Sequence, residues 1–150
     1  MNVTRYLDDL AVGQRFTSAT YEVTEGEIVR FAAEFDPQPF HLDPDAAKRS
    51  VFRGLVASGW HTAAVTMRLL VQGELRIAGG LVGLGGEARW PNPTRPGDVL
   101  HVESEITAIV PSRSRPELGV VTLHSETRNQ RGEIAQVLDA KLLVPRRGRE

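Results

Sequence analysis

The segment from Ser58 to about Ile77 constrains the fold of this chain more than any other. Over two helical turns, nearly every side of it carries an apolar residue, namely Ala63, Ala64, Val65, Met67, Leu69, Leu70 and Val71. A helix that is apolar on most sides has to be surrounded by other parts of the protein. We therefore predict a long helix at the centre of the molecule, which ends at Ala78-Gly79-Gly80.

Alternation of apolar and polar residues dominates the chain after this helix. It is seen in four runs, at residues 82–90, 100–108, 119–127 and 138–144. Turn-forming sequences at 96–98 and 129–132 separate them, which is typical of antiparallel strands with one buried face. An earlier strand is predicted from Gln14 to Val23. Five antiparallel strands wrapped around one long helix give an α+β fold, which is the outline of a hot dog fold.

Two shorter helices are predicted between the first strand and the central helix. Thr24 is a good N-cap, and Glu27 completes a capping box with it. Four residues after Thr24 recur at helical spacing and predict one buried stripe, namely Ile28, Phe31, Ala32 and Phe35. Pro37 ends this helix. Asp43-Pro44 then begins a short helix that runs through Lys48.

The length and composition are those of one globular domain. The chain has 150 residues, of which 41% are hydrophobic and 25% charged, enough to bury a core of its own. We expect a single domain over residues 1–150, with an ordered core at about 12–144 and a basic tail at 145–150. The net charge of −1 gives no reason to expect a nucleic acid or an anionic membrane as partner.

Several site classes and locations are disfavoured by what the sequence lacks. It has no cysteine, which excludes disulfides, thiolate metal sites and a cysteine nucleophile. His101 and His124 are predicted on separate strands with no Asp or Glu nearby at a metal-ligand spacing, so no metal site is expected. No apolar run approaches the ~18 residues of a membrane span, and the first residues do not resemble a signal peptide. We expect a cytoplasmic protein.

Residues 35–41 carry the chemistry that stands out. They read Phe-Asp-Pro-Gln-Pro-Phe-His, which places a carboxylate, Asp36, and an imidazole, His41, on a segment stiffened by two prolines. A fully extended segment would separate their Cα atoms by ~17 Å, so a bend has to bring them together, and we predict a non-helical one. Such a pair can hold one water molecule, take a proton from it and deliver another. Gln38 is predicted to bond the backbone of this bend.

The start of the central helix is the second candidate. Ser58 is expected to cap it, and the N–H groups of a helix N-terminus favour negative charge. Gly59 has no side chain, so its N–H could approach a carbonyl oxygen closely and act as an oxyanion donor. His61 could line the same pocket, although a core or interface position is favoured for it.

Taken together, these motifs resemble the signature of the MaoC-like dehydratases and (R)-specific enoyl-CoA hydratases. Residues 36–41 are similar to the family's Asp-x-Asn-Pro-hydrophobic-His, and residues 57–60 to its Ala-His-Gly-hydrophobic segment. Residues 90–100 are similar to aromatic-x-x-Pro-x-x-x-Gly-Asp-x-Leu, and the likeness runs from about 12 to 144. Four residues match the family pattern, namely Asp36, Pro39, His41 and Gly59. Gln38 and Ser58 depart from it, because the family prefers Asn and often has His there.

The resemblance implies reversible addition of water to a 2-enoyl-CoA thioester, giving an (R)-3-hydroxyacyl-CoA, with Asp36 and His41 as the acid/base pair. It implies substrate contacts from Gly59, Ser58, Gln38, Pro39 and Trp60. No cofactor is implied beyond the CoA thioester, which is the substrate. The expected assembly is a homodimer, or a dimer of dimers, with the acyl-CoA between subunits.

Two other functions fit the same motifs. In an acyl-CoA thioesterase of this fold, Asp36 would activate water toward the carbonyl carbon. In a non-catalytic acyl-CoA-binding or partner subunit, the departures at Gln38 and Ser58 would be signs of lost activity.

Overall fold

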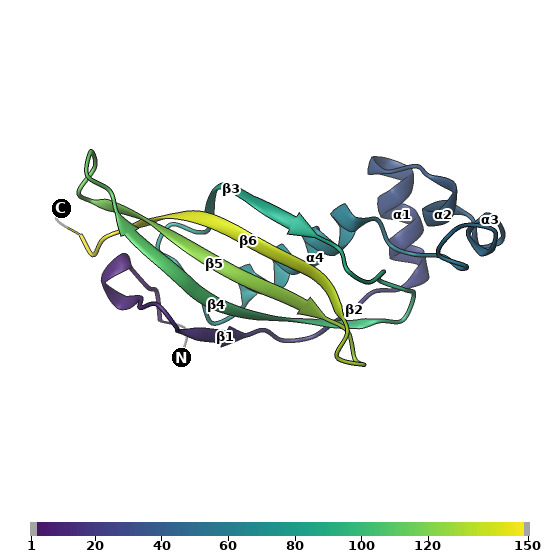
Figure 1. The fold of residues 1–150 in the computed structure, drawn as a ribbon, viewed down its shortest axis with the longest axis horizontal. Helices are drawn as coiled ribbons and strands as arrows, with labels where there is room; N and C mark the ends of the chain where they lie inside the picture. Colours follow the sequence, from purple (N-terminus) through teal and green to yellow (C-terminus); the bar gives the residue numbers. More distant parts are fainter. Residues whose placement is uncertain (1–2, 149–150) are drawn as a thin grey trace.

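The computed structural model describes residues 3–148 and confirms the predicted α+β architecture. In chain order its elements are η1 (Leu7–Asp9), β1 (Arg15–Thr17), β2 (Tyr21–Glu22), α1 (Glu25–Phe35), α2 (Pro39–Leu42), α3 (Pro44–Lys48), α4 (Gly59–Gln72), β3 (Val82–Arg89), β4 (Val99–Pro111), β5 (Leu118–Arg128) and β6 (Ile134–Pro145). The strand order is β1-β4-β5-β6-β3, with β2 also pairing with β4, and every pairing is antiparallel. Helix α4 lies on one face of this sheet, and α1 to α3 gather at the end away from the termini (Figure 1).

The core lies between α4 and the strands β4, β5 and β6. From the helix, Val65 and Leu69 are buried, and they belong to the same apolar cluster as Leu100, Ile106 and Leu123 of the sheet. The predicted alternation in residues 100–108 is confirmed, because every second residue from 100 to 106 is buried. This alternation turns one face of the curved sheet toward the helix, as expected of a hot dog fold.

Helix α4 is shorter than predicted. Ser58 caps its start as expected, but it ends at Gln72 rather than at the glycines after Ile77. Gly73 is the reason: its backbone is extended, and its N–H bonds to the Leu70 carbonyl oxygen in the last turn. Leu75 and Ile77 are nevertheless buried, because the chain continues against the core without helical structure.

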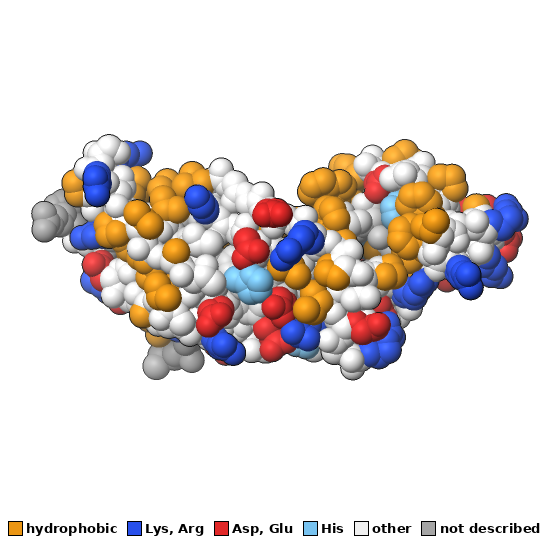
Figure 2. Space-filling view, viewed as in Figure 1, with side chains coloured by type: hydrophobic (Ala, Val, Ile, Leu, Met, Phe, Trp, Pro, Cys, Tyr) orange, Lys and Arg blue, Asp and Glu red, His pale blue; other side chains and the backbone are white. Residues whose placement is uncertain are grey.

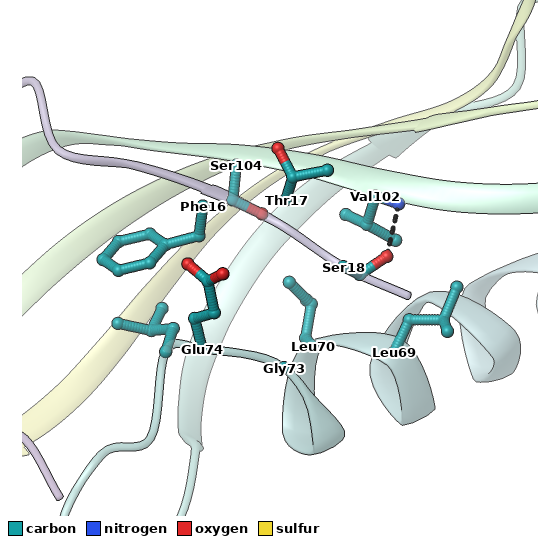
Figure 3. Close-up of a pocket in the computed structure, with 10 residues that line it drawn as sticks. Phe16, Thr17, Ser18, Leu69, Leu70, Gly73, Glu74, Val102 and Ser104 are labelled. Atoms are coloured by element: carbon teal, nitrogen blue, oxygen red, sulfur yellow. Dashed lines mark hydrogen bonds between the residues drawn. The ribbon is translucent and has the colours of Figure 1, made fainter. Parts of the chain in front are cut away.

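The single first strand that we predicted is in fact two short strands, β1 and β2. Between them, the Ser18 hydroxyl accepts a hydrogen bond from the Val102 N–H at 2.8 Å, which replaces a backbone bond of a continuous ladder. Figure 3 shows this bond beside a narrow slot that is lined by Phe16 of β1 and by Leu69 and Leu70 of α4. The slot holds only about 10 Å³ and is mainly apolar, so it is a packing crevice.

Helix α1 begins where predicted, but only half of the capping box forms. The Thr24 hydroxyl accepts from the Glu27 N–H, whereas the Glu27 carboxylate accepts the Tyr21 hydroxyl at 2.8 Å instead of the backbone N–H of the cap. The predicted buried stripe also ends early. Ile28 is fully buried, but Phe35 is 67% exposed, because no other element covers the last turn of α1.

Two apolar surfaces remain uncovered in the single chain. Strand β3 pairs only with β6, and its residues Val82 and Leu84 are exposed at the edge of the sheet. One stripe of α4 is exposed as well, with Trp60, Met67 and Val71 along it. The prediction of a helix buried on all sides is therefore wrong for the isolated chain.

Charged side chains gather on the outer face of the sheet, around a histidine (Figure 2). The His124 ring bonds to Glu126 at 3.0 Å and to Asp139 at 2.7 Å. Asp139 is the cross-strand neighbour of His124, a proximity that spacing along the chain did not reveal. No group of three or more potential ligands within residues 3–148 is arranged to bind a metal ion.

The end of the described chain is attached to the body of the protein. Arg147 forms an ion pair with Asp9 and lies over the Tyr6 ring. Of the predicted basic tail, residues 149–150 lie outside the described residues. None of the helices within 3–148 is long and apolar enough to cross a membrane.

Candidate active site

The bend that was predicted between Asp36 and His41 is present, with one difference. Helix α1 ends at Phe35, and the Asp36 N–H still bonds to the Ala32 carbonyl oxygen at 2.8 Å. The chain is then extended until Pro39, which begins the one-turn helix α2 that contains His41. The bend is therefore partly helical, because a proline at the first helical position is favourable.

Asp36 and His41 converge. His41 Nε2 lies 3.3 Å from Asp36 Oδ2, and the two side chains are 6% and 18% exposed. On its other side, His41 Nδ1 lies 2.6 Å from the Val56 carbonyl oxygen. A carbonyl oxygen only accepts, so Nδ1 carries a proton, and Nε2 is the nitrogen left to exchange one. The Val56 N–H also bonds to the Phe40 carbonyl oxygen, which fixes this strip of chain beside the imidazole.

The Asp36 carboxylate is surrounded by donors. The pKa of Asp36 is held below its usual value, chiefly because the Ser58 hydroxyl donates a hydrogen bond to the carboxylate, while burial opposes this effect. Gln38 and His41 lower the pKa of Asp36 further, and Gln38 Nε2 donates to Oδ1 at 2.5 Å. Gln38 was expected to bond the backbone, so its bond to the carboxylate corrects that prediction. Asp36 is thus an ionised acceptor at neutral pH.

The N-terminus of α4 lies next to this carboxylate. The fully buried Ser58 accepts from the Trp60 N–H at 3.2 Å, and its hydroxyl is also the largest cause of the lowered pKa of Asp36. Within residues 3–148, no acceptor is paired with the Gly59 N–H, as is usual for the first residue of a helix. The structure adds a reason for glycine here, because a Cβ would lie 2.7 Å from the Trp90 indole.

A cavity of about 290 Å³ opens beside the imidazole and the helix start. It is lined by Phe40, His41, Phe52, Val56, Ala57, Gly59, Thr62, Trp90, Pro91, Asn92, Pro93, Thr94 and Ala135. Of the residues predicted to contact substrate, Gly59 lines it, whereas Ser58, Gln38, Pro39 and Trp60 do not. Asp36 is not among its lining residues either. Trp60 is exposed and meets Trp90 edge to face, and it is Trp90 that forms the wall.

His61 occupies a core position, as favoured from the sequence. Its ring stacks on Phe31 with centroids 4.7 Å apart, and it does not line the cavity. Burial lowers the pKa of His61.

Sequence reasoning missed four features of the site. These are the Val56 carbonyl oxygen, the effect of the Ser58 hydroxyl on the Asp36 carboxylate, and the cavity-lining residues Thr62 and Thr94. Of these, only Thr62 had a signal, since it lies one helical turn after Ser58 and faces the same way.

Comparison with known proteins places this geometry in context. A family model described as "MaoC like domain" matches residues 9–129. A solved structure of a MaoC-like dehydratase from Rhodospirillum rubrum is 59% identical, with a TM-score of 0.94 over 96% of this chain and 99% of that one. An uncharacterized protein of Bacillus subtilis, YdeM, is 34% identical over 83% of this chain and 88% of its own length. An (R)-specific enoyl-CoA hydratase of Rhodospirillum rubrum is 26% identical over 97% and 96%.

Proposed function

This chain belongs to the family of MaoC-like domains, and from that premise we propose that it reversibly adds water to 2-enoyl-CoA thioesters to give (R)-3-hydroxyacyl-CoA. The observation that carries the proposal is the 3.3 Å approach of His41 Nε2 to Asp36 Oδ2, beside the N-terminus of α4. A water molecule bound to both groups would lie where two proton transfers can take place.

The proton transfers follow from the charges of the two groups. Asp36 is ionised at neutral pH, since its pKa lies below the ordinary value for an aspartate. It therefore acts as the base that takes a proton from water as the oxygen attacks C3. His41 Nε2, when protonated, delivers a proton to C2, and Nδ1 stays bonded to Val56 throughout. The enzyme is restored when the proton on Asp36 passes to His41. In dehydration each step runs in reverse.

The thioester oxygen gains negative charge as C3 is attacked. The unpaired Gly59 N–H at the start of α4 is the donor available to it. One such donor stabilises a transition state by roughly 3–4 kcal/mol in other enzymes, and the positive end of the helix dipole adds to it. Gly59 therefore serves as the oxyanion donor.

The proposal is tested by incubating the protein with crotonyl-CoA and following the absorbance of the conjugated thioester. Hydration lowers this absorbance without releasing free CoA, and the product is oxidised only by a dehydrogenase specific for the (R) isomer. Release of a free thiol would instead identify a thioesterase. Binding of crotonyl-CoA without any change in absorbance would identify a non-catalytic subunit.

Ser58→Ala tests how the carboxylate is tuned. Loss of the hydroxyl raises the pKa of Asp36, so the acid limb of the kcat/KM profile is expected to move to higher pH. Ser58→Thr keeps a hydroxyl and should leave the limb near its wild-type position. The Ala variant also loses the helix cap, which lowers stability by about 1 kcal/mol. An unshifted acid limb in Ser58→Ala would show that Ser58 does not set the charge of Asp36.

A second copy of this chain is proposed to cover the exposed apolar surfaces. The unpaired edge of β3 and the exposed stripe of α4 are the two candidates for this contact, and an open apolar edge strand is otherwise prone to aggregation. Met67→Asp places a charge in the stripe and is expected to halve the mass in solution, as measured by light scattering. Glu74→Asp, just beyond the helix, is the control. A wild-type monomer would contradict the dimer.

A further inference from the structure

The cavity beside His41 has apolar walls and a polar floor. Phe40, Phe52 and Trp90 form much of the wall. At the floor, the hydroxyl oxygens of Thr62 and Thr94 lie 2.9 Å apart, and both residues are only 3% exposed. Thr62 comes from α4 and Thr94 from the loop before β4, so the pair joins two separate parts of the chain.

One of the two hydroxyl protons of this pair has no hydrogen-bond acceptor in the described part of the chain. Each threonine hydroxyl carries one proton, and the bond between the two oxygens consumes one of them. Among residues 3–148, neither oxygen has a second partner within hydrogen-bonding distance. One buried O–H is therefore left without an acceptor, on the surface of the cavity. A buried donor without an acceptor is unfavourable, so the pair favours a ligand that provides one.

A neighbouring hydroxyl pair shows what complete pairing looks like. Thr66 gives its proton to the Thr62 carbonyl oxygen at 2.9 Å, so the Thr127 hydroxyl must donate to Thr66 across 2.6 Å. The Gln136 side-chain N–H donates to the Thr66 hydroxyl oxygen, and the Gln136 side-chain carbonyl oxygen accepts the Trp90 N–H at 2.9 Å. Every hydroxyl proton of this network has an acceptor. The Ser104–Ser125 pair, with its hydroxyl oxygens 3.0 Å apart, also lacks a second partner within residues 3–148, but it does not line the cavity beside His41.

The charge of the cavity limits what the pair can bind. Among the residues that the structure describes, no Lys or Arg lines it, and His41 is the only titratable residue that does. A carboxylate or phosphate would be buried without a cation, which is costly. A neutral oxygen, such as an ether, a ketone or a hydroxyl group, would accept the proton without this cost.

We propose that the Thr62–Thr94 pair binds a neutral oxygen atom in the acyl chain of the thioester, at about the fifth chain atom. The thioester itself rests on the proposed function. Gly59, the oxyanion donor, and Thr62 line the same cavity. The helix rises ~4.5 Å between them, which an extended acyl chain covers in about four bonds beyond its carbonyl carbon.

Calorimetric binding of two saturated thioesters tests this assignment without turnover. 4-Methoxybutanoyl-CoA is hexanoyl-CoA with its fifth chain atom replaced by oxygen, so the two ligands have the same length. The wild-type protein is expected to bind the ether about tenfold more tightly, which is the effect of one hydrogen bond. Thr62→Val/Thr94→Val keeps the volume, removes both hydroxyls and should abolish the preference. Thr62→Ser/Thr94→Ser should retain it and shows that the fold tolerates changes at both positions.

Three results would overturn the assignment. These are equal binding of both ligands by the wild-type protein, a preference that persists in the double Val variant, and an equal loss of affinity for both ligands in that variant. The last would place the pair against the pantetheine arm that all CoA thioesters share. Hydration of crotonyl-CoA is measured separately. Turnover without an ether preference refutes only this assignment, and an ether preference without turnover refutes only the hydratase.

Discussion

Asp36→Asn is expected to lower kcat for crotonyl-CoA hydration by roughly 10³- to 10⁴-fold, the upper part of the range for a lost general base. The amide has the size of the carboxylate and can still accept from Ser58, but it carries no charge and cannot take a proton from water at neutral pH. The measurement is the initial rate of absorbance loss at saturating crotonyl-CoA. KM is expected to change little, because Asp36 acts on water rather than on the thioester.

A matched control is provided by Asp45→Asn. Asp45 is an exposed aspartate of α3, 3.9 Å from Lys48, and it has no contact with the cavity. Its variant should keep wild-type kcat. Both variants should keep their melting temperature within a few degrees, which separates lost chemistry from lost structure. Wild-type turnover in Asp36→Asn would remove this residue from the mechanism and, with it, the reaction as we propose it.

The parts of the fold that sequence reasoning predicted are those determined by local patterns. Thr24 and Ser58 were identified as caps because a side-chain oxygen satisfies a nearby N–H. Strands β4 and β5 were found from their alternation, which reports a buried face directly. The alternation at 82–90 also predicted a strand, but β3 has no buried face in the single chain. The break after Ser18 was missed, because it depends on a bond to Val102 in a strand far along the chain.

Burial was predicted less well than secondary structure. Phe35 has the spacing of a core residue, yet it is largely exposed and its ring meets Phe31 of the same helix. The end of α4 was placed at the glycines after Ile77, although the earlier Gly73 already breaks the helix. The burial of Phe35 is decided by which other element reaches it, and spacing along the chain does not contain this information. The end of α4 did have a local signal in the sequence, which is Gly73 itself.

The candidate site also has features that the sequence predicted and features that depend on the folded chain. The convergence of Asp36 and His41 could be expected, because the two groups can share a water molecule only if the proline-stiffened segment between them bends. The partners that orient these groups could not. The Val56 carbonyl is a backbone atom with no sequence signal, and Trp90 meets Gly59 only because β3 leads the chain back beside α4. Such partners become visible only once the chain is folded.

His41→Ala is expected to lower kcat for crotonyl-CoA hydration by roughly 10²- to 10⁴-fold, as for other general acids. It removes the nitrogen that faces Asp36 and also leaves the buried Val56 carbonyl oxygen without its donor. An unpaired buried acceptor costs about 1–3 kcal/mol, so the melting temperature should fall as well. Reduced activity in this variant therefore has two possible causes, loss of the acid and loss of local structure.

His41→Asn separates these two causes. The side-chain nitrogen of asparagine can occupy the place of Nδ1 and donate to Val56, but nothing replaces Nε2 opposite Asp36. The melting temperature should then return toward the wild-type value while kcat stays as low as in His41→Ala. His101→Ala, a change on the outer face of the sheet, should affect neither quantity. If His41→Asn recovers turnover together with stability, then the imidazole serves only to hold Val56, and the proton must reach C2 from another group.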